Sequence, residues 1–257
     1  MDDKLKELLK TTIDKTKPLA EAAEVSDSKF LIVLLGIYRI SFTTLRDIEY
    51  ISRYEETASS ILDLTRKIIE HGISVEYMLM KGKEEMAERF QEYMIVQIHE
   101  EFELYRKTGQ DPATISEEHK INVEENQKEF DALCKKVKDR KSWAGRSVEG
   151  MIEDLEKEAA LGEFDISRLM HAYVWGCRLN HANPLVTHSQ FDLERVRSAN
   201  SFYLALGLSI AIAVHLRLTT RLIDESRLAA GSDIYPEITT EVGKIYEQLD
   251  SLPAEEA

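Results

Sequence analysis

The chain has 257 residues and is strongly acidic, with 47 Asp and Glu against 33 Lys and Arg and a net charge of -14. Such a charge repels phosphate backbones and anionic lipid surfaces, so the net charge does not favour binding to nucleic acids or membranes. RNA could be a substrate only if a local basic patch bound it. Only 11 Gly and 5 Pro accompany 31% charged residues, a composition with few turn formers and many helix formers. We therefore predict an all-α protein.

Apolar residues recur at three- and four-residue steps along most of the chain, which is the period of one helical face. We predict a single domain over residues 1–257, folded as a multi-helix bundle of about eight or nine helices, in which Pro18 interrupts the first. The predicted helices cover residues 2–17, 30–51, 56–80, 84–108, 116–141, 147–161, 165–182, 190–226 and 237–249. The 116–141 helix is charged nearly throughout, so we expect it to pack by one narrow stripe or to project.

One run, residues 198–216, is nearly as long and apolar as a membrane-spanning helix. We interpret it as a core helix, because it contains polar residues such as His215 and a helix that is apolar all round is typical of a bundle centre. Cys134 and Cys177 lie far apart without metal-ligand spacing, which fits free thiols in a reducing compartment. Because the N-terminal segment also lacks the pattern of a secretory signal, we predict a cytoplasmic protein without a membrane partner.

The 56–80 helix carries a polar line beside its apolar stripe, formed by Arg66, Glu70 and Tyr77. Such a line is either a solvated face or a buried ion-pair network, and only the second would be a site. Arg66 and His71 also fit the spacing of arginine, four to six residues and histidine that is typical of the helical ribonucleases called HEPN domains. The resemblance implies that Arg66 would hold a phosphate and that His71 would act as acid or base on the ribose hydroxyl.

A second constellation lies on the 165–182 helix, where His171, Trp175, Arg178 and His181 recur at helical spacing and share one face. In one interpretation they form a pocket for an anion, with Arg178 as the clamp and His181 as a titrating partner. In the other they form a buried polar seam between helices, with Trp175 in the core. No zinc, phosphate-loop, dinucleotide, nucleophile-elbow or calcium-loop motif is present, so we expect no metal and no cofactor.

Four stretches occur in a familiar order: ETASSILDLTRKIIEHGISVEYMLM, EEMAERFQEYM, SWAGRSVEGM and the helix that ends in NHANP. In this order the chain resembles the bacterial family catalogued as domain of unknown function 5677, over about residues 30–190. The family's polar and aromatic positions would here be Arg66, Glu70, Tyr77, Arg89, Tyr93, Trp143, Gly145, Ser147 and His181. The chain departs from the family at Cys177, where a hydroxyl residue is expected. The resemblance implies an all-helical fold and no established activity.

Two functions therefore remain open. The first is a binding or interaction module, of a bacterial defence or stress system, in which Arg66, Glu70, Arg178 and His181 recognise a small anionic ligand or only fix the fold. The alternative is a metal-independent ribonuclease of the HEPN type, which would use Arg66 with His71 or Arg178 with His181. Net acidity and the shortness of the arginine–histidine pattern favour the first. Amphipathic end helices and the 116–141 segment offer docking faces for a symmetric homodimer.

Overall fold

The computed structural model describes residues 2–22, 27–54, 57–108, 142–161, 166–180, 193–230 and 235–252. Within these ranges the chain forms eight helices and no strand, which confirms the predicted all-α bundle. The helices are α1 (Asp2–Ala22), α2 (Lys29–Ile51), α3 (Ala58–Lys81), α4 (Lys83–Thr108), α6 (Val148–Lys157), α7 (Ile166–Asn180), α9 (Leu193–Ala230) and α10 (Tyr235–Asp250). The prediction of a charged helix at 116–141 and the predicted site residue His181 lie outside the described ranges.

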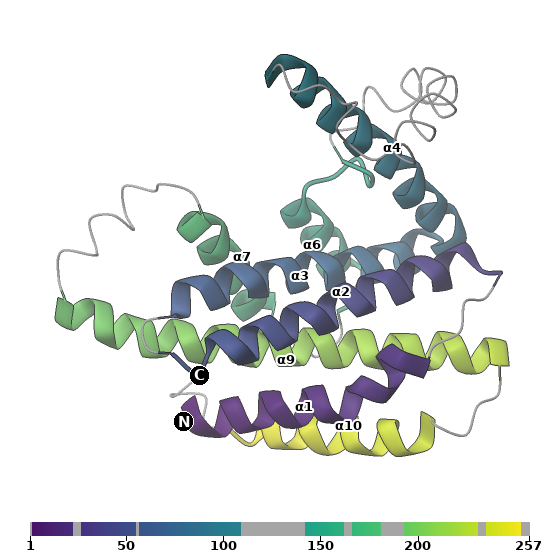
Figure 1. Cartoon of the computed structure of the whole chain (residues 1–257). Helices are drawn as coiled ribbons and strands as arrows, with labels where there is room; N and C mark the ends of the chain where they lie inside the picture. Colours follow the sequence, from purple (N-terminus) through teal and green to yellow (C-terminus); the bar gives the residue numbers. More distant parts are fainter. Residues whose placement is uncertain are drawn as a thin grey trace.

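Helix α3 is the centre of the bundle, and it packs against α9, α7, α2, α6 and α4 (Figure 1). Its apolar residues follow the helical period on more than one face, so a single helix can supply core to several neighbours. The buried side chains include Ile61, Leu62, Ile68, Ile69, Val75 and Met78, each fully enclosed. This central position brings the polar residues of α3 to helix–helix seams.

Helix α9 is the longest helix, and it runs along the whole bundle in Figure 1. Its stretch from Asn200 to Ser226 contains an 18-residue window with a mean hydropathy of 1.6 and is long and apolar enough to cross a membrane by length and composition. In the structure 78% of the most apolar window is buried against other helices. Helices α2 and α3 contact α9, and α1 and α10 contact it as well, in a separate layer visible at the bottom of Figure 1.

The predicted interruption at Pro18 is wrong, because α1 continues through this residue to Ala22. Proline removes one backbone hydrogen bond and strains the preceding turn, but it does not end a helix whose two sides are anchored by packing. Thr16 and Leu19, on either side of Pro18, are both buried, and the Thr16 carbonyl accepts a hydrogen bond of 2.9 Å from the Tyr38 hydroxyl. The other predicted helices that lie within the described residues agree with the structure to within a few residues at each described end, as is usual for helix boundaries.

Candidate functional site

Arg66 lies in the seam between α3 and α7, and its side chain is only 18% exposed. Gly176 of α7 makes this approach possible. A Cβ atom at position 176 would lie 2.8 Å from the Arg66 Cβ and 2.8 Å from the Leu62 carbonyl oxygen, both closer than real Cβ contacts allow. The glycine therefore lets the α7 backbone touch α3 at the position where the predicted polar line begins.

The polar contacts of Arg66 are long. Its guanidinium lies 3.5 Å from a carboxylate oxygen of Asp63 and 3.5 Å from one of Glu70, and its Nη1 lies 4.0 Å from the Cys177 sulfur. Two buried atoms of this cluster, the Arg66 Nε and the Asp63 Oδ1, have no hydrogen-bond partner. Burial raises the pKa of Glu70, and the attraction of Arg66 offsets this only in part. The Arg66 cluster is thus loosely paired.

His71 does not share the surroundings of Arg66, although both residues lie on α3. Five residues of helix place the two side chains roughly 140° apart around the axis, and Arg66 turns toward Cys177 of α7. The Nδ1 atom of His71 is buried without a hydrogen-bond partner, and burial together with the charge of Lys67 lowers the pKa of His71 to about 4. An imidazole with this pKa is neutral and weakly basic at pH 7, which does not suit the acid–base role that the ribonuclease pattern implies.

Tyr77, the last member of the polar line, lies in an apolar corner, where its side chain is buried. Its ring packs edge-on against Trp143 at 6.3 Å, Trp143 packs against Phe90 at 5.2 Å, and the Lys81 ammonium lies 5.8 Å from the Tyr77 centroid. The family positions Trp143, Gly145 and Ser147, in the connector before α6, have a structural explanation here. Trp143 fills this corner, Gly145 adopts a φ of +68° that favours glycine, and the Ser147 hydroxyl caps α6 by accepting from the Gly150 amide.

Two further family positions, Arg89 and Tyr93, lie on α4, one at the surface and the other against the core. Arg89 is paired with Glu85 at 2.6 Å on the solvent side, and the ring of Tyr93 packs partly buried against the core. In the described part of the chain, the polar partners of Arg66 are Asp63, Glu70 and Cys177, and neither Arg89 nor Tyr93 is among them.

A surface of aromatic rings and an arginine joins α7 to the N-terminal half of α9. We call it the aromatic–arginine surface; its members are His171, Trp175, Arg178, Phe202 and Tyr203. The ring centroids of Trp175 and Tyr203 are 4.9 Å apart, and the His171 ring is nearly parallel to that of Tyr203 at 6.4 Å. The Arg178 guanidinium lies 5.4 Å from the Trp175 ring, a cation–π distance. The structure thus brings the predicted residues His171, Trp175 and Arg178 together.

This surface is open to solvent over part of its area. His171 and Arg178 are exposed, and Phe202 is 45% exposed. Burial raises the pKa of Tyr203, and the positive charge of Arg178 counteracts that rise. The sequence did not reveal Phe202 and Tyr203 as members, since their proximity to α7 depends on how α7 packs against α9.

A second ionic cluster, which the sequence analysis missed, joins α3 to α9. The carboxylate of Glu76, whose side chain is 5% exposed, accepts two hydrogen bonds from Arg217 and two from Arg221 at 2.8–3.1 Å. Burial would raise the pKa of Glu76, but these hydrogen bonds outweigh it and hold the pKa below its usual value. A sequence signal did exist: Glu76 is a lone charge inside an apolar run, and the two arginines are four residues apart on one helical face.

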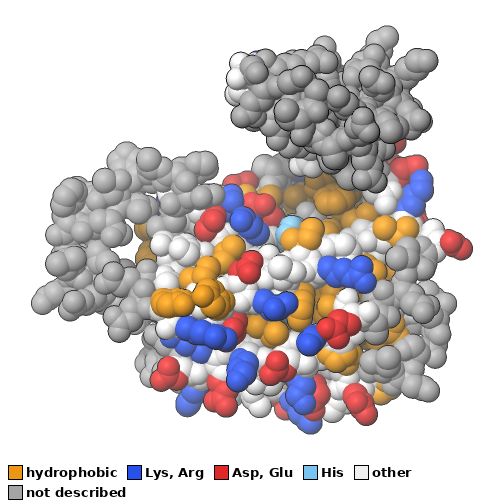
Figure 2. Space-filling model, in the orientation of Figure 1, with side chains coloured by type: hydrophobic (Ala, Val, Ile, Leu, Met, Phe, Trp, Pro, Cys, Tyr) orange, Lys and Arg blue, Asp and Glu red, His pale blue; other side chains and the backbone are white. Residues whose placement is uncertain are grey.

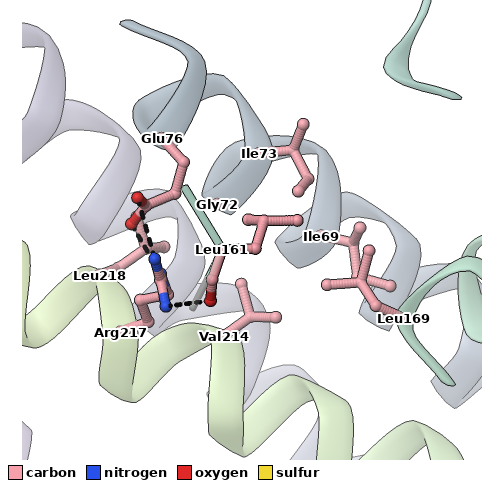
Figure 3. A pocket seen from close by; sticks show the side chains of 9 residues that line it. All are labelled: Ile69, Gly72, Ile73, Glu76, Leu161, Leu169, Val214, Arg217 and Leu218. Atoms are coloured by element: carbon pink, nitrogen blue, oxygen red, sulfur yellow. Dashed lines mark hydrogen bonds and ion pairs between the residues drawn. The ribbon is translucent and has the colours of Figure 1, made fainter. Parts of the chain in front are cut away.

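Arg217 also connects this cluster to the end of the segment after α6. It donates to the backbone carbonyls of Ala160 and Leu161, each at 2.9 Å, and Figure 3 shows its guanidinium between the Glu76 carboxylate and the Leu161 carbonyl. A small cavity next to it, lined also by Gly72 and Val214, has a volume of about 10 Å³, close to the space that one water molecule needs. With every described group paired and no room for a ligand, this cluster has the properties of architecture.

A third polar node lies in the core, around His215 of α9. The imidazole is fully buried, with Nε2 at 3.2 Å from the Thr16 hydroxyl and Nδ1 at 3.0 Å from the Ser41 hydroxyl, and it stacks on Tyr38 at 5.2 Å. Burial lowers the pKa of His215 to about 3. Both ring nitrogens are occupied within the chain, so His215 ties α1, α2 and α9 together and faces no open space.

No group of three or more His, Cys, Asp or Glu side chains that could hold a metal ion occurs among the residues the structure describes. No curated protein and no solved structure matches the chain. One family model does match, over residues 31–195, and it includes the Arg66 cluster, the Trp143 corner and the α7 half of the aromatic–arginine surface. Since this match covers more than half of the chain, the protein belongs to the family of unknown function DUF5677.

Proposed function

We propose that the protein is a binding module that holds a small anion with a flat aromatic part, of the nucleotide class, on the aromatic–arginine surface. The observation that carries this proposal is the set of four adjacent, partly exposed rings with Arg178 over Trp175 at 5.4 Å. Aromatic faces stack on nucleobases whatever the base, and a guanidinium binds phosphate oxygens in a bidentate fashion. The two halves of a nucleotide would thus find their matching groups side by side.

The local charge supports an anionic ligand, although the chain as a whole is acidic. Helix α7 contains Arg168, Arg178 and His171 and no Asp or Glu at all. A small anion meets mainly this local field, because screening confines electrostatic attraction to roughly 10 Å in ordinary salt. A long nucleic-acid strand would also meet the net charge of -14, so a mononucleotide fits better than a polymer.

The Arg66 cluster is less suited to an anion. Asp63 and Glu70 lie within 3.5 Å of the Arg66 guanidinium and compensate its charge, and their carboxylates would repel a phosphate. Of the two predicted anion positions, Arg178 is the exposed one, whereas the side chain of Arg66 is only 18% exposed. We therefore assign ligand binding to α7 and α9.

Calorimetric titration with adenosine 5′-monophosphate tests the proposal, with adenosine and inorganic phosphate as partial ligands. Trp175→Ala is expected to weaken binding of the whole nucleotide by about 5- to 150-fold, because stacking on one ring contributes about 1–3 kcal/mol. Arg178→Ala is expected to weaken the nucleotide about tenfold or more and to leave adenosine unchanged. Since Arg178 is exposed, its removal leaves the fold intact.

Arg53→Ala is the matched control, because Arg53 is also an exposed arginine near an aromatic ring. It lies in the turn after α2 rather than on α7 or α9, and its guanidinium is 5.8 Å from the ring of Tyr50. It is expected to leave nucleotide affinity unchanged. Absence of binding by the wild-type protein, or affinities that Trp175→Ala and Arg178→Ala leave untouched, would overturn the proposal.

A further inference from the structure

The solvent-facing side of α2 carries an unusual number of exposed apolar side chains. Of the five large hydrophobic residues that are exposed in the described part of the chain, four belong to α2 or to the turn after it: Ile32 at 39%, Ile40 at 54%, Tyr50 at 59% and Tyr54 at 58%. Figure 2 shows hydrophobic side chains among charged ones on the face that α2 crosses in Figure 1. Contiguous exposed apolar surface on a folded protein is typical of an interaction site.

The exposed residues of α2 form one stripe along the helix. Ile32, Gly36, Ile40, Thr43, Asp47 and Tyr50 follow one another at steps of three and four, Tyr54 comes four residues later in the turn after the helix, and all are exposed. Residues at this spacing lie on one face of a helix. At 1.5 Å per residue the helical part of the stripe, from Ile32 to Tyr50, is about 27 Å long, enough to pack along a second helix of similar length.

The order of residues in this stripe is complementary to its own reverse. Counting outward from Thr43, the seventh residue on one side is Gly36 and on the other Tyr50, so an antiparallel copy would place each tyrosine ring over the other copy's glycine. The fourth residues are Arg39 and Asp47, which are exposed and opposite in charge; Arg39 borders the stripe, and its Nε also donates to the Ala20 carbonyl at 3.3 Å.

The eleventh residues outward from Thr43 are Ile32 and Tyr54, both large and apolar. At these three pairs large side chains meet small or apolar ones and charges meet opposite charges; the remaining stripe residue, Ile40, would face the exposed Arg46, whose aliphatic part can cover it.

We infer that this stripe, the α2 face, is the interface of a symmetric homodimer in which the α2 helices of two copies pack antiparallel about a twofold axis at Thr43. A twofold interface is isologous: if residue i contacts residue j, residue j contacts residue i. The pairing of Gly36 with Tyr50 and of Arg39 with Asp47 has this property. If an unrelated protein bound here, the stripe would have to complement the surface of that protein, and its residues would not need to complement one another about Thr43.

Gly36 supports a helix on this face rather than a loop or a solvated surface. It lies inside α2, where glycine is less favourable than alanine, and a Cβ at this position would meet no atom of the described residues within 4 Å. Packing within the described part of the chain therefore gives no reason for a glycine. Close approach of a second helix does give one, since a residue without a side chain leaves room for a ring opposite.

This interface is independent of the proposed nucleotide site, which lies on α7 and α9, and it differs from the end helices and the charged 116–141 segment that the sequence favoured for dimer contacts. Light scattering coupled to size exclusion measures the first expected outcome. The wild-type chain should have twice the monomer mass in the micromolar range, and Gly36→Gln should shift it to the monomer or weaken dimerisation at least tenfold.

Gly36→Gln should not harm the fold, because the side chain extends into open space and replaces a glycine in a helix. Its denaturation midpoint, measured at a concentration where both proteins are monomeric, is expected to equal or exceed that of the wild type. A loss of dimer therefore cannot be attributed to unfolding.

Cross-linking tests the twofold axis itself. Thr43→Cys should form a disulfide between residues 43 of two copies under mild oxidation, identified by mass spectrometry of the linked peptide. Thr240→Cys is the matched control, because Thr43 and Thr240 are both exposed helical threonines whose hydroxyls donate to the carbonyl four residues earlier.

Three results would overturn the inference. They are a wild-type chain that stays monomeric throughout the micromolar range, a dimer that Gly36→Gln leaves intact, and a 43–43 cross-link no more abundant than the 240–240 cross-link. A dimer that survives Gly36→Gln would mean that the copies associate through another face.

Discussion

Helix α3 carries two ionic clusters, around Arg66 and around Glu76, that differ in how fully their polar atoms are paired. The Glu76 carboxylate accepts four hydrogen bonds of 2.8–3.1 Å from Arg217 and Arg221. The Arg66 guanidinium lies 3.5 Å from each of its two carboxylates, and its Nε has no partner. The same helix therefore holds one cluster with good geometry and one with poor geometry.

Burial acts on both glutamates of α3 in the same way, but their pKa values move in opposite directions because their arginine partners lie at different distances. Both are partly or fully removed from water, which disfavours the charged carboxylate. At Glu76 the hydrogen bonds from two arginines more than compensate, and the pKa falls; at Glu70 the distant Arg66 compensates only in part, and the pKa rises. Polar residues on a core helix thus stabilise a bundle only where the partner reaches hydrogen-bond distance.

The largest expected effect is that of Glu76→Gln. This change leaves the partly buried Arg217 and Arg221 without a counter-charge; breaking a fully buried pair typically costs about 3–5 kcal/mol, and with these side chains 22% and 34% exposed the loss should lie at the lower end of that range. Denaturant titration at pH 7 measures the loss. Glu85→Gln is the matched control: Glu85 also pairs with an arginine at 2.6 Å, but its side chain is 66% exposed, so the loss should stay within about 1 kcal/mol. Equal effects of the two changes would contradict the architectural role of the Glu76 cluster.

The sequence could predict the helices, because their periodicity is local. It could not predict that α1 continues through Pro18, since the anchoring of Thr16 by Tyr38 comes from another helix. It also placed His171, Trp175 and Arg178 on one face of α7 correctly, because residues three and four apart on a helix are neighbours.

Contacts between helices were beyond the sequence pattern. The partners of Glu76 are about 140 residues away in sequence, and those of His215 are 174 and 199 residues away. The spacing of Arg66, Glu70 and Tyr77 did not reveal that the first two lie in a loose ionic seam and the third in an aromatic corner. A pattern on one helix states which residues share a face, and only packing determines what that face meets.

Gly176→Ala is expected to have an intermediate effect, because it acts on the close contact that holds α7 against the Arg66 cluster. The new Cβ would lie 2.8 Å from the Leu62 carbonyl oxygen, which is backbone and cannot turn away, so the helices must separate at a cost of about 1–3 kcal/mol. Gly243→Ala, in the interior of α10 with no atom of the described residues within 4 Å of the added Cβ, should instead stabilise by about 0.5–1 kcal/mol. Thermal or denaturant unfolding compares them. A neutral Gly176→Ala would show that the α3–α7 seam yields freely.

The smallest expected effect has the opposite sign, and it belongs to Glu70→Gln. Because the pKa of Glu70 is raised above 4.5 by burial, the folded protein binds this proton more tightly than the unfolded chain does. The ionised carboxylate therefore lowers stability at pH 7, and this penalty disappears as the pH falls below 4.5 and both states become protonated.

Glu70→Gln should accordingly raise the free energy of unfolding at pH 7 by less than about 1 kcal/mol, since the side chain is 35% exposed and water screens the effect. The gain should vanish near pH 4. The Glu76→Gln loss has the opposite sign and a lower pH window: it is fully present above pH 4.5 and shrinks as the pH falls from 4.5 through the lowered pKa of the wild-type carboxylate. Unfolding titrations of both variants at several pH values measure these slopes. If Glu70→Gln instead destabilises the protein at pH 7, the Arg66 cluster is a second structural ion pair, and the contrast between the two ionic clusters of α3 is lost.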